Sequence, residues 1–106
     1  MRLWLPTLAV FLAFSFFPFG SSRRQRTHGA QDFNTYGCRH CHTVDGVGGQ
    51  RGPDLSDVGK LMTKSALRRQ IVHGGTSMPP FRNVLDRRQL NDLIAYLRSN
   101  RRNTGE

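Results

Sequence analysis

The chain has two cysteines, and both lie in one pentapeptide, Cys38-Arg39-His40-Cys41-His42. A Cys-x-x-Cys-His run is typical of c-type haem attachment, in which two thiols bond to the haem vinyl groups and the histidine ligates the iron. Residues three and four apart share one face of a helix, so a single turn can present both thiols and the imidazole of His42. The motif therefore predicts a fold built around one covalently held, flat cofactor.

Two other chemistries use the same residue types. A structural zinc site takes four ligands, commonly from two separated pairs, and the chain has no second cysteine pair. The histidines outside the motif's last position are His28, His40 and His73, and none stands in a paired spacing. A thioredoxin-like thiol pair needs strands that alternate with helices, whereas the downstream sequence indicates loops and helices. Haem attachment is the favoured interpretation, with zinc binding and thiol exchange as alternatives.

The first residues differ from the rest in composition. The stretch from Leu3 to Phe19 is largely apolar, follows a positive start at Arg2 and precedes the small residues Gly20-Ser21-Ser22. This order is typical of a cleaved secretory signal. An uncleaved membrane anchor is the alternative, although the stretch is short for a span and the arginines after it oppose the positive-inside bias. With either outcome we expect an extracytoplasmic, periplasmic location.

The 106 residues leave room for one domain. We divide them into a signal peptide or anchor (1–22), a basic linker (23–30), a haem domain (31–100) and a C-terminal tail (101–106). A core this small is marginal unless a cofactor adds to it. The 16 lysines and arginines against 7 acidic residues do not indicate nucleic-acid binding, because no recognition motif accompanies them. An acidic surface on a redox partner is the better match.

Periodicity predicts a helix from about Gln31 to Cys41, with Phe33 and Tyr36 as its apolar pair. The following stretch, 43–54, contains four glycines and Pro53, so we expect a loop without regular structure. A second helix is predicted from the N-cap Thr63 to just before Gly74. Its apolar residues are Leu67, Ile71 and Val72.

The last helix carries the strongest pattern. Asp86 and Gln89 have the spacing of a capping box, and the helix is predicted to end near Asn100. Apolar side chains then recur at helical spacing, at Leu90, Leu93, Ile94 and Leu97. Tyr96 lies beside this stripe, where it could pack on the first helix.

Met78 is the candidate for the second iron ligand. Pairing the histidine with a methionine sulfur is common in electron-carrying cytochromes and raises the reduction potential. Pro79 and Pro80 follow it, fix the local backbone and remove two amide donors. Met62 is the rival, but its position just ahead of a helix indicates packing. His73 lies in a last helical turn, where the helix dipole explains it better than ligation does.

Four motifs in this order resemble the class I monohaem cytochromes c: Cys38 to His42, Gly52-Pro53-Asp54-Leu55, Gly75 to Phe81, and Asp92 to Leu97. The resemblance covers about residues 31–99. It implies a small all-α fold of about three main helices around one haem c, bound through Cys38 and Cys41, with its iron held by His42 and Met78.

The same resemblance assigns roles to neighbouring residues. It implies that the Pro53 carbonyl accepts a hydrogen bond from His42 Nδ1 and that Leu55 and Phe81 line the haem pocket. It also implies that the terminal helices cross near Gly37 and Tyr96. One departure is that Phe33 lies five residues before Cys38, whereas many relatives have their aromatic residue four before.

We therefore expect a monomeric electron carrier and not an enzyme, with a place in a larger oxidoreductase complex left open. Its partners would be redox proteins such as a dehydrogenase, an oxidase or another cytochrome, and it would contact a membrane only through an uncleaved N-terminal segment. Four basic residues are candidates for steering that docking: Arg39, Lys60, Lys64 and Arg82. The alternative is a haem enzyme or sensor in which the Met78 position is labile and binds peroxide or a diatomic gas.

Overall fold

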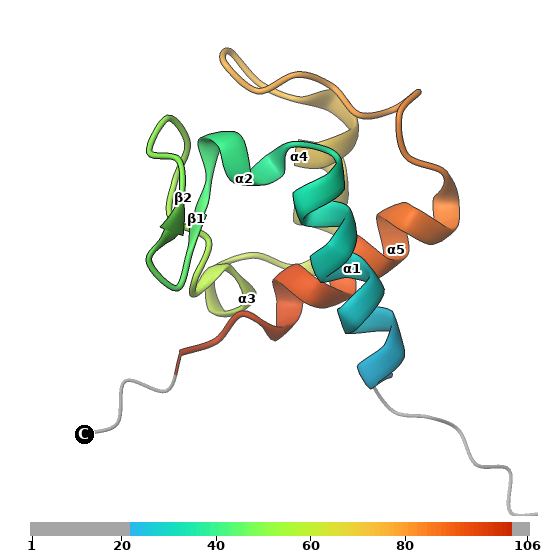
Figure 1. Cartoon of the computed structure of the whole chain (residues 1–106). Coiled ribbons are helices and arrows are strands. Elements are labelled where there is room, and N and C mark those ends of the chain that lie inside the picture. The colour runs from blue at the N-terminus through green and yellow to red at the C-terminus, as the bar shows by residue number, and fades with distance from the viewer. Residues whose placement is uncertain (1–21, 103–106) are drawn as a thin grey trace, which may run out of the picture.

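Three helices of ten or more residues form the framework of the computed structural model, which describes residues 22–102 (Figure 1). They are α1 (Arg23–Thr35), α4 (Lys64–His73) and α5 (Arg87–Ser99). Two one-turn helices, α2 (Cys38–Cys41) and α3 (Val58–Leu61), and a hairpin of β1 (Thr43–Val44) and β2 (Val47–Gly48) complete the described chain. The prediction of a small all-α fold with about three main helices is confirmed.

The expected signal or anchor lies almost entirely outside the described residues, as do positions 103–106 of the predicted tail. Among residues 22–102, no helix combines the length and the apolar character that a membrane crossing requires.

Helix α1 begins at Arg23, so the segment 23–30 is helical and its prediction as a linker was wrong. The start is set by Ser22, whose Oγ accepts a hydrogen bond from the Gln25 amide at 3.0 Å. The predicted continuous helix to Cys41 is also interrupted. Gly37 adopts a left-handed φ of +82° between α1 and α2, which breaks the helical path and starts α2 in a new direction.

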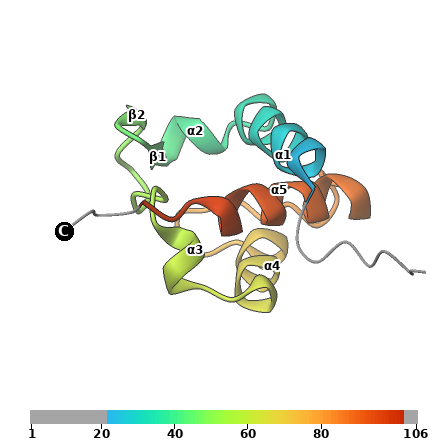
Figure 2. The same ribbon diagram turned by 90° about the horizontal axis from the view of Figure 1, so that it is seen from below.

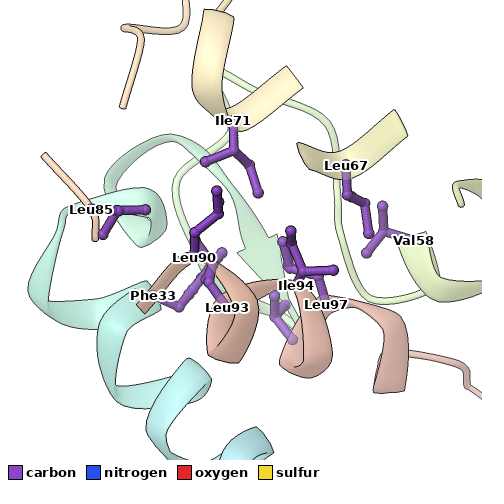
Figure 3. Close-up of a cluster of buried hydrophobic side chains, with 10 residues drawn as sticks. Phe33, Val58, Leu67, Ile71, Leu85, Leu90, Leu93, Ile94 and Leu97 are labelled. Atoms are coloured by element: carbon purple, nitrogen blue, oxygen red, sulfur yellow. The ribbon is translucent and has the colours of Figure 1, made fainter. Parts of the chain in front are cut away.

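Helix α5 is the central element, with α1 on one side and α3 and α4 on the other (Figure 2). Its predicted capping box is present, since Gln89 N donates to Asp86 Oδ1 at 2.8 Å and Asp86 N donates to Gln89 Oε1 at 3.0 Å. The predicted apolar stripe is buried and meets side chains from α1, α3, α4 and the loop before α5 (Figure 3). The labelled members of this core are Phe33, Val58, Leu67, Ile71, Leu85, Leu90, Leu93, Ile94 and Leu97.

Helices α1 and α5 pack backbone to backbone at Gly29. A Cβ on Gly29 would lie 2.0 Å from the Asp92 carbonyl oxygen and 2.7 Å from Tyr96 Cβ. One helical turn later, Phe33 is fully buried, and its ring meets Tyr96 edge-on with the centroids 5.6 Å apart. The expected packing of Tyr96 on the first helix is confirmed. The expected crossing near Gly37 is wrong, because the residue without a side chain at the contact is Gly29.

Helix α4 follows its prediction. Thr63 Oγ1 accepts from the Ala66 amide at 3.1 Å at the N-cap, and Gly74 ends the helix. The short helix α3 was not predicted, and its carbonyl groups are bound by a side chain from α5. Arg98 Nη1 donates to the carbonyls of Gly59 at 2.9 Å and Met62 at 2.6 Å. Met62 is half-buried against the core, which agrees with its interpretation as a packing residue.

The prediction of no regular structure in 43–54 was wrong. Thr43 pairs with Gly48 and Val44 with Val47 in an antiparallel hairpin. Its two turn residues, Asp45 and Gly46, have φ of +51° and +81°. Positive φ at both central positions is the type I′ turn, for which an Asp-Gly pair is favoured.

A buried serine fixes the loop after this hairpin. Ser56 Oγ donates to Asp54 Oδ1 at 2.5 Å and accepts from the Asp45 amide at 2.8 Å. The Ser56 amide also donates to Asp54 Oδ1, at 2.8 Å. These bonds from the Ser56 side chain and backbone hold the pKa of the Asp54 carboxyl below its ordinary value of 3.8.

Changing Gly29 to Ala should destabilise the fold by about 1–3 kcal/mol, because the added methyl group meets backbone atoms that cannot move aside. This cost exceeds the gain of roughly 1 kcal/mol that alanine brings to a helix interior. Denaturant unfolding of the purified protein measures the effect. Gln31→Ala on the exposed side of the same helix is the control and should stay within about 0.5 kcal/mol of wild type. Equal stabilities of the two variants would contradict the close contact.

The Asp54 carboxylate should make stability depend on acid. Its folded-state pKa lies below the unfolded value, so its contribution is present above pH 3.8 and is lost as the pH falls through the lowered pKa. Asp54→Asn removes this titration, so the free energy of unfolding should fall less steeply with acid than in wild type. Urea unfolding at several pH values from about 5 to about 2 tests this. Parallel curves for the two proteins would refute it.

Candidate haem site

The two thiols and the imidazole of the motif come from a single turn of chain. Cys38 and Cys41 are the first and last residues of α2, and His42 caps the helix with its amide bonded to the Cys38 carbonyl at 3.0 Å. Both cysteines are free and half-buried. This is the arrangement that two thioether bonds and one axial ligand from consecutive residues require.

The ring of His42 is held from two sides. Its Nδ1 lies 2.8 Å from the Pro53 carbonyl oxygen, the contact that the resemblance implied. A carbonyl can only accept, so Nδ1 carries the proton and Nε2 keeps a lone pair for a metal. Gly52 lies against the ring, where a Cβ would come within 2.5 Å of His42 Cε1. Sequence reasoning did not give Gly52 this role.

The glycine-rich loop packs directly on the backbone of the motif. Amides of the loop donate to motif carbonyls, from Gly49 to Arg39 at 2.9 Å and from Gly52 to Cys41 at 2.7 Å. A Cβ on Gly49 would lie 1.9 Å from the His40 carbonyl oxygen. Because glycine has no side chain, the loop can come close enough to form hydrogen bonds with the backbone of α2, which carries the cysteines.

Arg39, one of the four candidate docking residues, is half-buried and makes contacts within the protein. Its Nε donates to Asn34 Oδ1 at 2.6 Å, and its Nη1 donates to the Val47 carbonyl at 3.1 Å. Its guanidinium also lies 5.3 Å from the ring centroid of Phe33. One side chain between the two cysteines thus joins α1 to the hairpin.

The other three candidate docking residues are exposed. Lys60 nevertheless has an internal partner, because its amine donates to the Arg102 carbonyl. The structure gives no such partner to Lys64 or Arg82 among the described residues.

The segment with Met78 folds back over the end of α4. Gly74 has φ of +68°, and a Cβ there would lie 2.5 Å from the Met78 carbonyl oxygen and 2.8 Å from Pro80 N. The Gly75 amide donates to the same Met78 carbonyl at 2.9 Å, and the Phe81 amide donates to the Ile71 carbonyl at 3.0 Å. Gly74 is needed here for both its conformation and the space, and the prolines fix the rest of the turn.

Half-buried apolar side chains pack on the margin of the core, and the predicted pocket residues are among them. Leu55, Met78, Phe81 and Cys38 all contact the buried cluster while staying partly exposed. Apolar side chains are costly to leave in water, and a flat apolar ring laid against them would remove that exposure. Together with the free Nε2 of His42, these residues fit a haem.

A polar hollow elsewhere in the described residues does not suit that cofactor. It lies between α1 and the start of α5, has a volume of about 330 Å³ and contains three carboxylates. Its lining residues are His28, Gln31, Asp32, Asp86, Arg88, Gln89 and Asp92. Burial and the neighbouring Asp92 raise the pKa of the Asp32 carboxyl in this wall.

The two alternative chemistries find little support in the site. Burial raises the pKa of the Cys38 thiol to about 11, whereas thiol-exchange centres need a lowered value. Within residues 22–102, which contain every cysteine and histidine of the chain, no three His, Cys, Asp or Glu side chains are grouped to hold a metal.

A family described as cytochrome c oxidase, cbb3-type, subunit III matches residues 24–97. The match runs from the first turn of α1 to the last turn of α5 and contains the whole cysteine motif. Comparisons with curated proteins and with solved structures gave no match. A domain of this kind carries electrons through covalently bound haem c and its iron. The chain belongs to this family of c-type cytochrome domains.

Proposed function

We propose that the protein carries single electrons through one haem bonded to Cys38 and Cys41, with His42 and Met78 as the axial ligands. The observation that supports this most directly is the His42 ring, bonded through Nδ1 to Pro53 and packed on Gly52 so that Nε2 is left for iron. The haem, when bound, supplies the ferric and ferrous states between which the electron moves.

The chain sets how readily that change occurs. The Pro53 carbonyl fixes the tautomer of His42 and makes Nε2 a stronger donor. A Met78 thioether bound to the iron would favour its ferrous state, and the apolar side chains of Leu55 and Phe81 would keep water from the haem. Because His42 and Met78 would both hold the iron, no substrate would have to bind it, which supports a carrier rather than a catalyst.

We place this carrier outside the cytoplasmic membrane, because the chain begins with a signal-like or anchor-like segment. Its partners in this proposal are redox proteins with acidic docking surfaces. Because the family is described as a subunit of an oxidase, other subunits of such a complex are candidates too. In this proposal the protein is a monomer. Its exposed cations Lys64, on α4, and Arg82, in the loop after Met78, would guide the encounter with the partner.

Mass spectrometry of the protein from an extracytoplasmic fraction tests the cofactor and the location together. We expect one haem to stay on the chain after denaturation, because thioether bonds survive unfolding. Replacing both Cys38 and Cys41 with Ala should abolish the added mass. A polypeptide mass without haem in wild type would overturn the proposal, and the mass of the chain also shows whether the N-terminal segment has been removed.

The ligand Met78 is tested by the ferric absorption spectrum. Wild type should have the weak long-wavelength band of sulfur bound to ferric haem iron, and Met78→Ala should lose it and have a lower reduction potential. The matched control is Met62→Ala, which removes another half-buried methionine and should keep the band. Loss of the band in the control only, or rapid carbon monoxide binding by reduced wild type, would point away from Met78 as a firm ligand.

A further inference from the structure

The side chain of Gln70 lies against the turn that carries Met78. Its Nε2 donates to the Gly74 carbonyl at 3.2 Å and is 3.9 Å from Met78 Sδ, in reach of a long hydrogen bond to sulfur. A carboxamide has two N–H donors, so both contacts can exist at once. The carboxamide of Gln70, in the second half of α4, therefore links the Gly74 carbonyl to the thioether of Met78.

The geometry around Gly75 supports the same placement independently. A Cβ on Gly75 would lie 3.2 Å from Gln70 Nε2, so the turn closes over the carboxamide itself. The backbone is closed as well, because the Gly74 amide donates to the Gln70 carbonyl at 2.9 Å and the Gly75 amide donates to the Met78 carbonyl at 2.9 Å. The main chain fixes where Met78 stands, and Gln70 reaches its sulfur.

We propose that Gln70 is a positioning residue for Met78, whose N–H orients the thioether sulfur and raises the reduction potential of the protein. This inference rests on the proposed ligation by Met78. A thioether sulfur has two lone pairs, so it can accept an N–H while it binds a metal. Hydrogen bonds to metal ligands orient them and tune the metal.

The direction of the effect follows from electrostatics. The N–H dipole points its positive end toward the sulfur, which penalises the state in which the neighbouring iron carries one more positive charge. The ferric form is thus disfavoured relative to the ferrous form. A glutamine gives this dipole without a net charge, in contrast to its neighbours Arg68 and Arg69.

The test is Gln70→Met in the haem-loaded protein, since methionine has similar length and helix propensity but no donor. We expect the midpoint potential to fall by an amount equal to a three- to tenfold change in the reduction equilibrium constant, tenfold being 59 mV for one electron. Gln70→Glu keeps the shape but has no N–H and adds negative charge, so its potential should fall at least as far. Gln31→Met, the same change on an exposed residue of α1, should leave the potential unchanged.

The ferric spectrum and the denaturant midpoint are recorded for each variant. A lower potential in Gln70→Met with the long-wavelength band and the fold intact supports the inference. If the band is present and both Gln70 variants keep the wild-type potential, Gln70 has no such role, while His/Met ligation stands. The same conclusion follows if the potential of Gln31→Met falls as far as that of Gln70→Met. If wild type has no band, it is the ligation by Met78 that fails, and the role of Gln70 fails with it.

Discussion

A one-turn helix that must present two thiols and an imidazole to one rigid ring constrains everything around it. Helix α2 is too short to be stable alone, so its orientation comes from the chain packed on it. Arg39 joins it to α1 and to the hairpin, and the loop through Gly49 and Gly52 bonds to its backbone. All of these contacts come from the polypeptide, so residues outside the motif set the orientation of α2.

Helix α5 connects this motif to the opposite side of the site. Its middle meets α1 through Gly29, while its end bonds to the segment that begins with Leu55. Asn100 donates to the Leu55 carbonyl at 3.3 Å and accepts from the Gly59 amide at 3.0 Å. Arg102 pairs with Asp57 through both guanidinium and amide, and this pairing holds the pKa of the Asp57 carboxyl below its ordinary value. A predicted pocket residue is thus placed by residues forty-odd positions away.

The parts of the fold that could be predicted are those with local causes. The capping box of α5, the N-cap Thr63 and the apolar stripe from Leu90 to Leu97 involve residues within a few positions of one another. The crossing at Gly29 could not be predicted, because a glycine shows what it contacts only when its partner is in place. Helix α3 was missed for the same reason, since its carbonyls are held by Arg98. At the site, the resemblance implied the contact between His42 and Pro53 that the structure has, but not the packing role of Gly52.

The positive charge of the chain is a poor guide to its docking surface until the internal partners are known. Several arginines have structural contacts, among them Arg39 in the motif, Arg98 of α5 with the carbonyls of α3, and Arg102 with Asp57. Arg68 likewise donates to Asn91 at 2.7 Å. Cations held in such pairs keep their long-range attraction but lose the freedom to rearrange against a partner. Of the four candidate docking residues, Lys64 at the start of α4 and Arg82 in the loop after Met78 have no such partner among residues 22–102. Within that set, these two are therefore the ones left free to rearrange against a partner.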